Sequence, residues 1–242
     1  MSRRELPPLA ARVLAAYGGA ERWASARSIR ATLSIGGLAL LVKGRWPLRH
    51  VSVGAELDFP RMRIDGLAGS RSVAWLEGGS ARLASLSGET WTARGDARAR
   101  LRGLRRLLWW DRLDATYFLG YLLWNELTFP RLFLRPDVEW TQLDDVSLSA
   151  TFPSGFPTHC TEQIFRFDRE TGLLRRHDFT ADVFGRWARA AAIVIKHREW
   201  DGIMYVCRRL ATPGGAGGKR FTWPVLWSEE VHGWQLSSAS LS

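Results

Sequence analysis

The chain of 242 residues has the length of one large sandwich or barrel domain, and 46% of its residues are hydrophobic. No stretch approaches the roughly 18 apolar residues of a membrane-spanning helix, and two cysteines are too few for a disulfide framework. The net charge is +10, but the basic residues are spread along the chain, so nucleic acid is not the expected partner.

The N-terminal segment, residues 1–27, is predicted to form a helical cap. Its first helix ends at Gly18 and Gly19, because glycine readily adopts the left-handed conformation found at helix C-termini. Pro8 and Arg12 interrupt the apolar run, so the segment does not have the pattern of a signal peptide. Together with the low cysteine count, this predicts a cytoplasmic protein.

From Ser28 onward the sequence alternates between hydrophobic and polar residues, which is typical of strands with one face toward water. The clearest later strands are predicted at residues 161–167, 173–181 and 189–198. About ten or eleven short strands at this spacing favour closure into a barrel or sandwich. We therefore expect a single mainly β domain over residues 1–242, a half-open antiparallel β-barrel.

The middle of the chain, residues 98–128, is predicted to be a helical plug or lid. Leucines and arginines segregate to opposite sides of a helix over residues 98–108. Residues 117–127 are apolar nearly all round, so that helix must be buried, with Asp111 or Asp114 as its N-cap. A buried helix inside an open barrel predicts a cavity between helix and sheet.

Two segments resemble a known family. Residues 15–23, A-A-Y-G-G-A-E-R-W, are followed by the strand from Ser28, as at the start of bacterial lipoprotein-carrier-like (LolA/LolB-like) proteins. Residues 167–178, F-D-R-E-T-G-L-L-R-R-H-D, are similar to the central hairpin of that superfamily. The resemblance, which also extends to uncharacterised bacterial proteins of this type, implies an incomplete barrel closed by a helix and a ligand of the acyl-chain class. No residue role is carried over from the family.

The leading functional prediction is the binding of an apolar small molecule or lipid in the barrel cavity, with no cofactor. Thirteen tryptophans exceed what a core of this size needs, and aromatic rings commonly line ligand pockets. Polar groups at the end of a buried helix need partners, which a ligand head group could supply. The candidate ligand-binding residues are Trp109, Trp110, Tyr117, Tyr121, Trp124, Asn125 and Glu126.

A cofactor-independent enzyme, such as a cyclase, isomerase or hydrolase, is the alternative use of the same cavity. His177 is the candidate catalytic base, because imidazole titrates near neutral pH. Its neighbour Asp178 points to the opposite face of the strand and cannot pair with it. His159 and His197 lie on or beside neighbouring strands, but the predicted register places the three histidines too far apart for one metal ion.

A third possibility is a basic surface that binds nucleic acid or a membrane. The segment from Arg98 to Trp110 resembles an interfacial membrane helix, although a solvated cover over the cavity is the favoured interpretation. The glycine loop at residues 214–219 lacks the spacing of a phosphate-binding loop, and a strand rather than a helix follows it.

Overall fold

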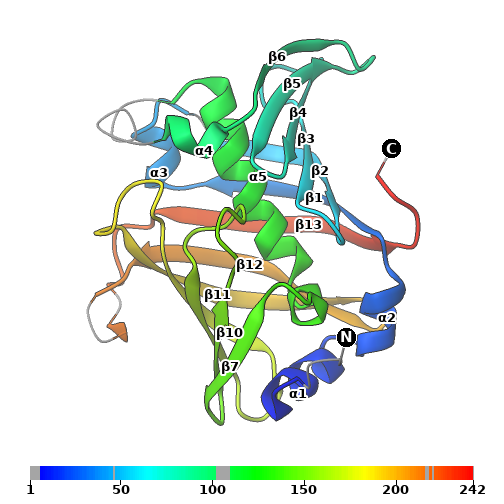
Figure 1. Cartoon of the computed structure of the whole chain (residues 1–242), viewed down its shortest axis with the longest axis vertical. Helices are drawn as coiled ribbons and strands as arrows, with labels where there is room; N and C mark the ends of the chain where they lie inside the picture. The colour runs from blue at the N-terminus through cyan, green and yellow to red at the C-terminus, as the bar shows by residue number, and fades with distance from the viewer. Residues whose placement is uncertain (1–5, 46, 102–109, 216–217, 220, 242) are drawn as a thin grey trace.

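The computed structural model describes residues 6–45, 47–101, 110–215, 218–219 and 221–241. In this part of the chain, one antiparallel sheet of 13 strands has the order β6-β5-β4-β3-β2-β1-β13-β12-β11-β10-β9-β8-β7. Within each half of the chain, consecutive strands are sheet neighbours, and the pairing of β1 with β13 joins the N-terminal half to the C-terminal half (Figure 1). The sheet is not closed, and β6 and β7 form its edges.

The helices are few and short apart from one. They are α1 (Pro8–Ala16), α2 (Ala20–Ser25), α3 (Leu38–Leu41), α4 (Ala97–Arg100), α5 (Arg112–Thr128) and the 3-10 helix η2 (Arg131–Leu134). The strands of the N-terminal half are β1 (Ser28–Gly36), β2 (Leu48–Glu56), β3 (Arg61–Asp65), β4 (Ser72–Glu77), β5 (Ser80–Ser85) and β6 (Thr90–Arg94). Those of the C-terminal half are β7 (Glu139–Asp144), β8 (Ser147–Thr151), β9 (Glu162–Phe167), β10 (Leu174–Thr180), β11 (Arg189–Trp200), β12 (Ile203–Pro213) and β13 (Trp227–Ser237).

The predicted mainly β architecture is confirmed, but the predicted count of ten or eleven strands is wrong. The edge strands β6 and β7 were missed. Most of their residues are exposed, with burial confined to positions such as Trp140 in β7. An edge strand with water on both faces lacks the hydrophobic alternation on which a sequence-based assignment depends.

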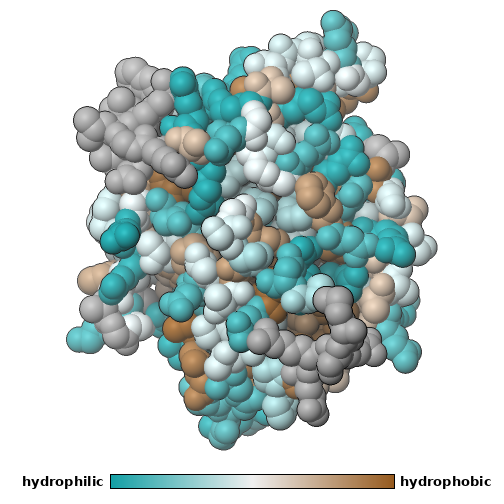
Figure 2. All heavy atoms as spheres, in the orientation of Figure 1, coloured by the Kyte–Doolittle hydropathy of each residue, from teal (hydrophilic) through white to brown (hydrophobic). Residues whose placement is uncertain are grey.

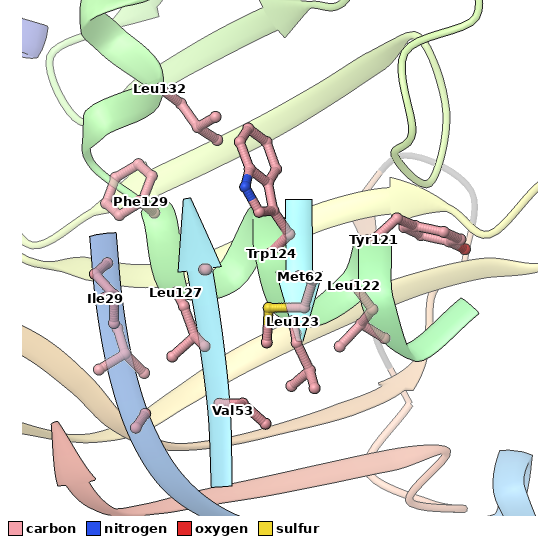
Figure 3. Packing of buried hydrophobic residues seen from close by; sticks show 14 of the residues in the cluster. Ile29, Val53, Met62, Tyr121, Leu122, Leu123, Trp124, Leu127, Phe129 and Leu132 are labelled. Atoms are coloured by element: carbon pink, nitrogen blue, oxygen red, sulfur yellow. The ribbon is translucent and has the colours of Figure 1, made fainter. Parts of the chain in front are cut away.

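Helix α5 lies across one face of the sheet and packs against β2, β3, β4 and β5 (Figure 1). Figure 3 shows Leu123 and Leu127 of α5 beside Met62, Val53 and Ile29 from the strands. All but the first residue of α5 are buried, which agrees with the apolar pattern predicted for residues 117–127. The helix therefore fills much of the space that the sheet encloses.

The start of α5 is fixed by a reciprocal capping box. The Asp111 side chain accepts a hydrogen bond from the Asp114 N–H at 2.8 Å, and Asp114 accepts one from the Asp111 N–H at 3.1 Å. Burial opposes ionisation of Asp111, but Arg94 and the helix N–H groups outweigh it and lower its pKa to about 2. Asp111 is therefore the N-cap, and Asp114 completes the same motif.

The predicted helical cap at the N-terminus corresponds to α1 and α2. Trp23 of α2 is fully buried, its Nε1 donates to the Tyr17 carbonyl at 2.9 Å, and its ring lies against Trp234 of β13. The hydroxyl of Tyr17 contacts His197 Nε2 at 3.0 Å. These contacts attach the two helices to the sheet.

The predicted amphipathic segment from Arg98 to Trp110 is described only at its ends, because residues 102–109, including Trp109, lie outside the described residues. Arg98 turns into the protein: its guanidinium donates to Tyr117 Oη at 3.2 Å and to the Thr158 carbonyl at 2.8 Å, and it pairs with Asp182. In the part of the chain that is described, no helix is both long and apolar enough to cross a membrane. Hydrophilic residues cover much of the face drawn in Figure 2.

Candidate functional site: an apolar pocket beside helix α5

One stripe of α5 faces an apolar pocket of about 280 Å³ instead of the sheet core. Phe118, Leu122 and Glu126 are spaced by four residues, which places them above one another on one side of the helix. All three line the pocket, together with residues of α3, β11, β12 and the segment between β10 and β11. The pocket therefore lies between the helix and the C-terminal half of the sheet.

Small side chains on the strands leave room for this pocket. Ala190 of β11 and Ala211 of β12 both line it, at positions where larger residues would fill the space against α5. Trp227 at the start of β13 is the cross-strand partner of Ala211 and forms the adjoining wall. The cavity thus follows from alanines at inward positions of two neighbouring strands.

The mouth of the pocket is apolar and open to solvent. Trp187, in the turn between β10 and β11, is 71% exposed, and Val42, just after α3, is 59% exposed. Leu38 of α3 adds a third exposed side chain to the rim. Large apolar side chains in water at the entrance of an apolar cavity are typical of a binding site for an apolar molecule.

Glu126, which lines the pocket, belongs to a buried cluster of charged side chains. Glu126 of α5 and Arg209 of β12 are each only 4% exposed, with Glu126 Oε1 and Arg209 Nη1 3.5 Å apart. Glu229 of β13 is the cross-strand neighbour of Arg209 and is also buried. Burial raises the pKa of Glu126 well above its usual range against the attraction of Arg209, and the Glu229 carboxylate adds to the rise.

His159 lines the same pocket and is kept neutral. Its ring stacks on Phe179 with 3.8 Å between centroids, and its Nδ1 lies 3.4 Å from the Tyr121 hydroxyl. Burial, helped by the positive charge of Arg98, lowers the pKa of His159 to about 3. At neutral pH the ring is therefore an uncharged part of the pocket wall.

His177, the predicted catalytic base, lies behind this wall. Its Nε2 lies 2.6 Å from Gln163 Oε1, and its ring stacks on Phe165. It lines a separate small cavity of about 10 Å³ that also borders Glu126 and Arg209, close to the room that one water molecule needs. Burial, with His159 and Arg209 nearby, lowers the pKa of His177 well below its usual range.

The other predicted ligand-binding residues are distributed around the helix. Tyr117 receives the hydrogen bond from Arg98, and Tyr121 contacts His159. Trp124 points to the N-terminal half of the sheet, where its Nε1 donates to the Glu56 carbonyl at 2.6 Å. Asn125 donates to the carbonyls of Tyr121 and Pro157, and Trp110 packs on Phe118. Of the predicted residues that are described, Glu126 alone lines the apolar pocket.

Sequence reasoning did not single out several residues of this site, among them Arg209 and Glu229. A signal for these two was present. In β12 the buried positions Ile203, Tyr205 and Cys207 recur every second residue, and Arg209 occupies the next position of the same face. Glu229 similarly follows Trp227 and precedes Val231 on the buried face of β13. A charged residue in the apolar phase of a strand predicts a buried charge that needs a partner.

Comparison with known proteins gives matches in structure alone. No family model matches the chain, and no curated protein matches its sequence. A putative outer membrane lipoprotein-sorting protein domain from Vibrio parahaemolyticus is 9% identical, with a TM-score of 0.50 over 89% of both chains. The fold is LolA-like.

Two further solved structures are similar over most of this chain. A LolA superfamily protein from Nitrosomonas europaea is 9% identical, with a TM-score of 0.46 over 87% of this chain and 86% of that one. A DUF1329 family protein from Desulfovibrio piger is 12% identical, with a TM-score of 0.46 over 94% of this chain and 90% of that one. The resemblance predicted from the sequence is confirmed at the level of the fold by the domain from Vibrio parahaemolyticus.

The predicted cytoplasmic location is wrong by the same comparison. The solved structure from Vibrio parahaemolyticus is named as a putative outer membrane lipoprotein-sorting protein domain, which contradicts the cytoplasmic prediction. The prediction rested on the first residues and on the low number of cysteines. Cys160 and Cys207 are free thiols, one half-buried and one buried, and two such residues do not determine a compartment.

Proposed function

We propose that the protein binds an apolar small molecule or acyl chain in the pocket beside α5. The observation that carries the proposal is the pocket itself, a cavity of about 280 Å³ with walls of aromatic and aliphatic side chains and an exposed apolar mouth at Trp187 and Val42. Burial of apolar ligand surface supplies the binding free energy, at about 25 cal/mol per Å². The LolA-like fold supports this ligand class and an extracytoplasmic location.

The histidines and Tyr121 near this pocket are suited to binding and not to base catalysis. His177 is hydrogen-bonded to Gln163 and does not line the apolar pocket, while His159 remains neutral in its wall. Burial also raises the pKa of Tyr121 well above its usual value, so its hydroxyl stays protonated. These groups are suited to fixing a wall in place, and they do not supply a base that is active near neutral pH.

Titration with the fluorescent apolar probe N-phenyl-1-naphthylamine tests the proposal. Ala211→Leu adds three carbon atoms inside the pocket, and we expect it to weaken probe binding at least tenfold without unfolding the protein, because the added atoms enter existing space. Ala93→Leu on the exposed edge strand β6 is the matched control and should bind as the wild type does. Equal affinity in the wild type and Ala211→Leu would place the probe elsewhere and contradict the proposal.

A further inference from the structure

The buried charged cluster around Glu126 has more unpaired hydrogen-bond acceptors than unpaired donors. Among the described side chains, four buried oxygens are without a hydrogen-bond partner here: Glu126 Oε2, Asn125 Oδ1, and both carboxylate oxygens of Glu229. The buried nitrogens without a partner in the same region are Arg209 Nε and Trp227 Nε1. Such groups cost free energy while they remain unpaired.

The arginine of the cluster does not balance its carboxyl groups. Arg209 is the cation between two acidic side chains, Glu126 and Glu229, and Arg209 Nη2 also donates to the Glu126 backbone carbonyl at 3.3 Å. Glu126 approaches Arg209 through Oε1, and Oε2 accepts from no N–H or hydroxyl donor of the described residues. Since Glu126 lines both the apolar pocket and the small polar cavity, its side chain lies where the two meet.

We infer that the pocket takes its ligand with a hydrogen-bond-donating group, a hydroxyl or an ammonium, at the inner end against Glu126. The inference rests on the proposed function, since it names the chemistry of the ligand bound in that pocket. A hydroxyl or ammonium donates to the unused oxygen of Glu126, while the attached hydrocarbon contacts Phe118, Leu122 and Ala211 along the walls. A ligand that ends in a carboxylate would instead add a third acidic group beside Glu126 and Glu229 and is disfavoured.

Four eight-carbon compounds that differ only in the end group test this inference: octane, octan-1-ol, octylamine and octanoate. Each is used to displace N-phenyl-1-naphthylamine from the wild-type protein at pH 7. We expect octan-1-ol or octylamine to displace the probe at a concentration about five- to tenfold lower than octane, as one added hydrogen bond predicts. Octanoate should compete less well than octan-1-ol.

Substitution of Glu126 tests whether this residue causes the preference for octan-1-ol and octylamine over octane. Glu126→Leu removes both carboxyl oxygens and leaves Arg209 beside Glu229 across the β12–β13 pair, so the remaining charges still balance. In this variant octane, octan-1-ol and octylamine should compete within about twofold of one another. Glu126→Gln keeps an uncharged acceptor oxygen for Arg209 and for the ligand, so it should retain the preference for octan-1-ol over octane. Glu199→Leu, at an exposed position of β11, is the control.

These measurements distinguish a wrong head-group inference from a wrong proposal that the pocket binds apolar molecules. If the probe binds and Ala211→Leu abolishes binding, but octane competes as well as octan-1-ol and octylamine, the head-group inference is overturned and the apolar pocket stands. Stronger competition by octanoate than by either donor compound also overturns the inference. Absence of probe binding to the wild type refutes the proposed function itself. The wild-type ranking alone is decisive if a variant does not fold.

Discussion

Glu126 links the stability of the protein to pH through its buried carboxyl group. It faces Arg209 and Glu229 from the sheet, and His159 and His177 line the cavities that it borders. Its folded-state pKa is raised, chiefly by burial. Its contribution to stability is therefore fully present below the usual pKa of about 4.5 and is lost as pH rises toward the folded-state value.

We predict that Glu126→Gln reduces this decline. Glutamine does not ionise. The free energy of unfolding of the variant should therefore fall less than that of the wild type between pH 4.5 and 8. Urea denaturation at several pH values measures it. Glu199→Gln should follow the wild-type profile. Parallel profiles for the wild type and Glu126→Gln would show that Glu126 is ionised at its ordinary pKa.

His159 produces a pH dependence in the opposite direction. Its pKa falls from an ordinary 6.5 to about 3 on burial, so the neutral ring stabilises the fold above pH 6.5 and this contribution is lost as pH falls toward 3. A single group of this kind changes the free energy of unfolding by at most about 1.4 kcal/mol per pH unit. We predict that His159→Phe, which keeps the stack on Phe179, loses less free energy of unfolding than the wild type between pH 6.5 and 4.5. Urea denaturation at several pH values in this range measures the difference. A steeper acid transition in the variant would contradict the assignment.

At the scale of elements, α5 approaches the sheet most closely where it has no side chain. A Cβ atom built on Gly120 would lie 2.6 Å from the Cβ of Leu76 in β4, well inside the contact distance of two carbon atoms. Both atoms are bound directly to the backbone, so neither can rotate away. The glycine therefore sets the distance between the helix and the N-terminal half of the sheet.

We predict that Gly120→Ala destabilises the protein by about 1–3 kcal/mol, the usual cost of overpacking a core. Helix propensity alone favours alanine over glycine by about 1 kcal/mol, so the sign of the effect distinguishes packing from propensity. Gly95→Ala is the matched control, because its added Cβ meets nothing within 4 Å. Chemical denaturation of both variants provides the comparison. A stabilised Gly120→Ala would mean that α5 lies farther from β4.

The elements that the sequence predicts are those whose burial has a simple period. Alternation places most interior strands, and the apolar segment at residues 117–127 locates the core of α5. The exposed edges β6 and β7 have no such period and were missed. A cavity between the helix and the sheet was predicted, but most of its lining residues were not, because the lining depends on which strand faces α5 and on small residues such as Ala190 and Ala211 meeting there. Sequence periodicity predicts that a side chain points inward, but it does not predict what lies opposite.

At the scale of the whole molecule, α5 packs tightly against one half of the open sheet and borders the pocket on the other half. Its packing against β2 to β5 involves the N-terminal half, and the pocket borders β11, β12 and β13 of the C-terminal half. The helix is therefore held by one half of the sheet while the other half leaves space beside it. A ligand can enter this space without displacing the packing at Gly120 and Leu76.

Ligand binding should consequently stabilise the whole fold, because an unfolded chain has no pocket. At a free concentration ten times its dissociation constant, N-phenyl-1-naphthylamine should raise the free energy of unfolding by about 1.4 kcal/mol. For a chain of this length that corresponds to a rise of about 3–5 °C in Tm. Scanning calorimetry of the wild type should show a rise that grows with the logarithm of probe concentration.

The same experiment on Ala211→Leu distinguishes pocket binding from adsorption to exposed apolar side chains. Trp187 and Trp223 are exposed in both proteins, and adsorption there would act on the wild type and the variant alike. A probe inside the pocket should raise the Tm of the wild type and leave that of Ala211→Leu unchanged at the same concentration, because the leucine occupies the ligand's place. An equal shift in both proteins would assign the effect to the surface, since the variant differs from the wild type only inside the cavity.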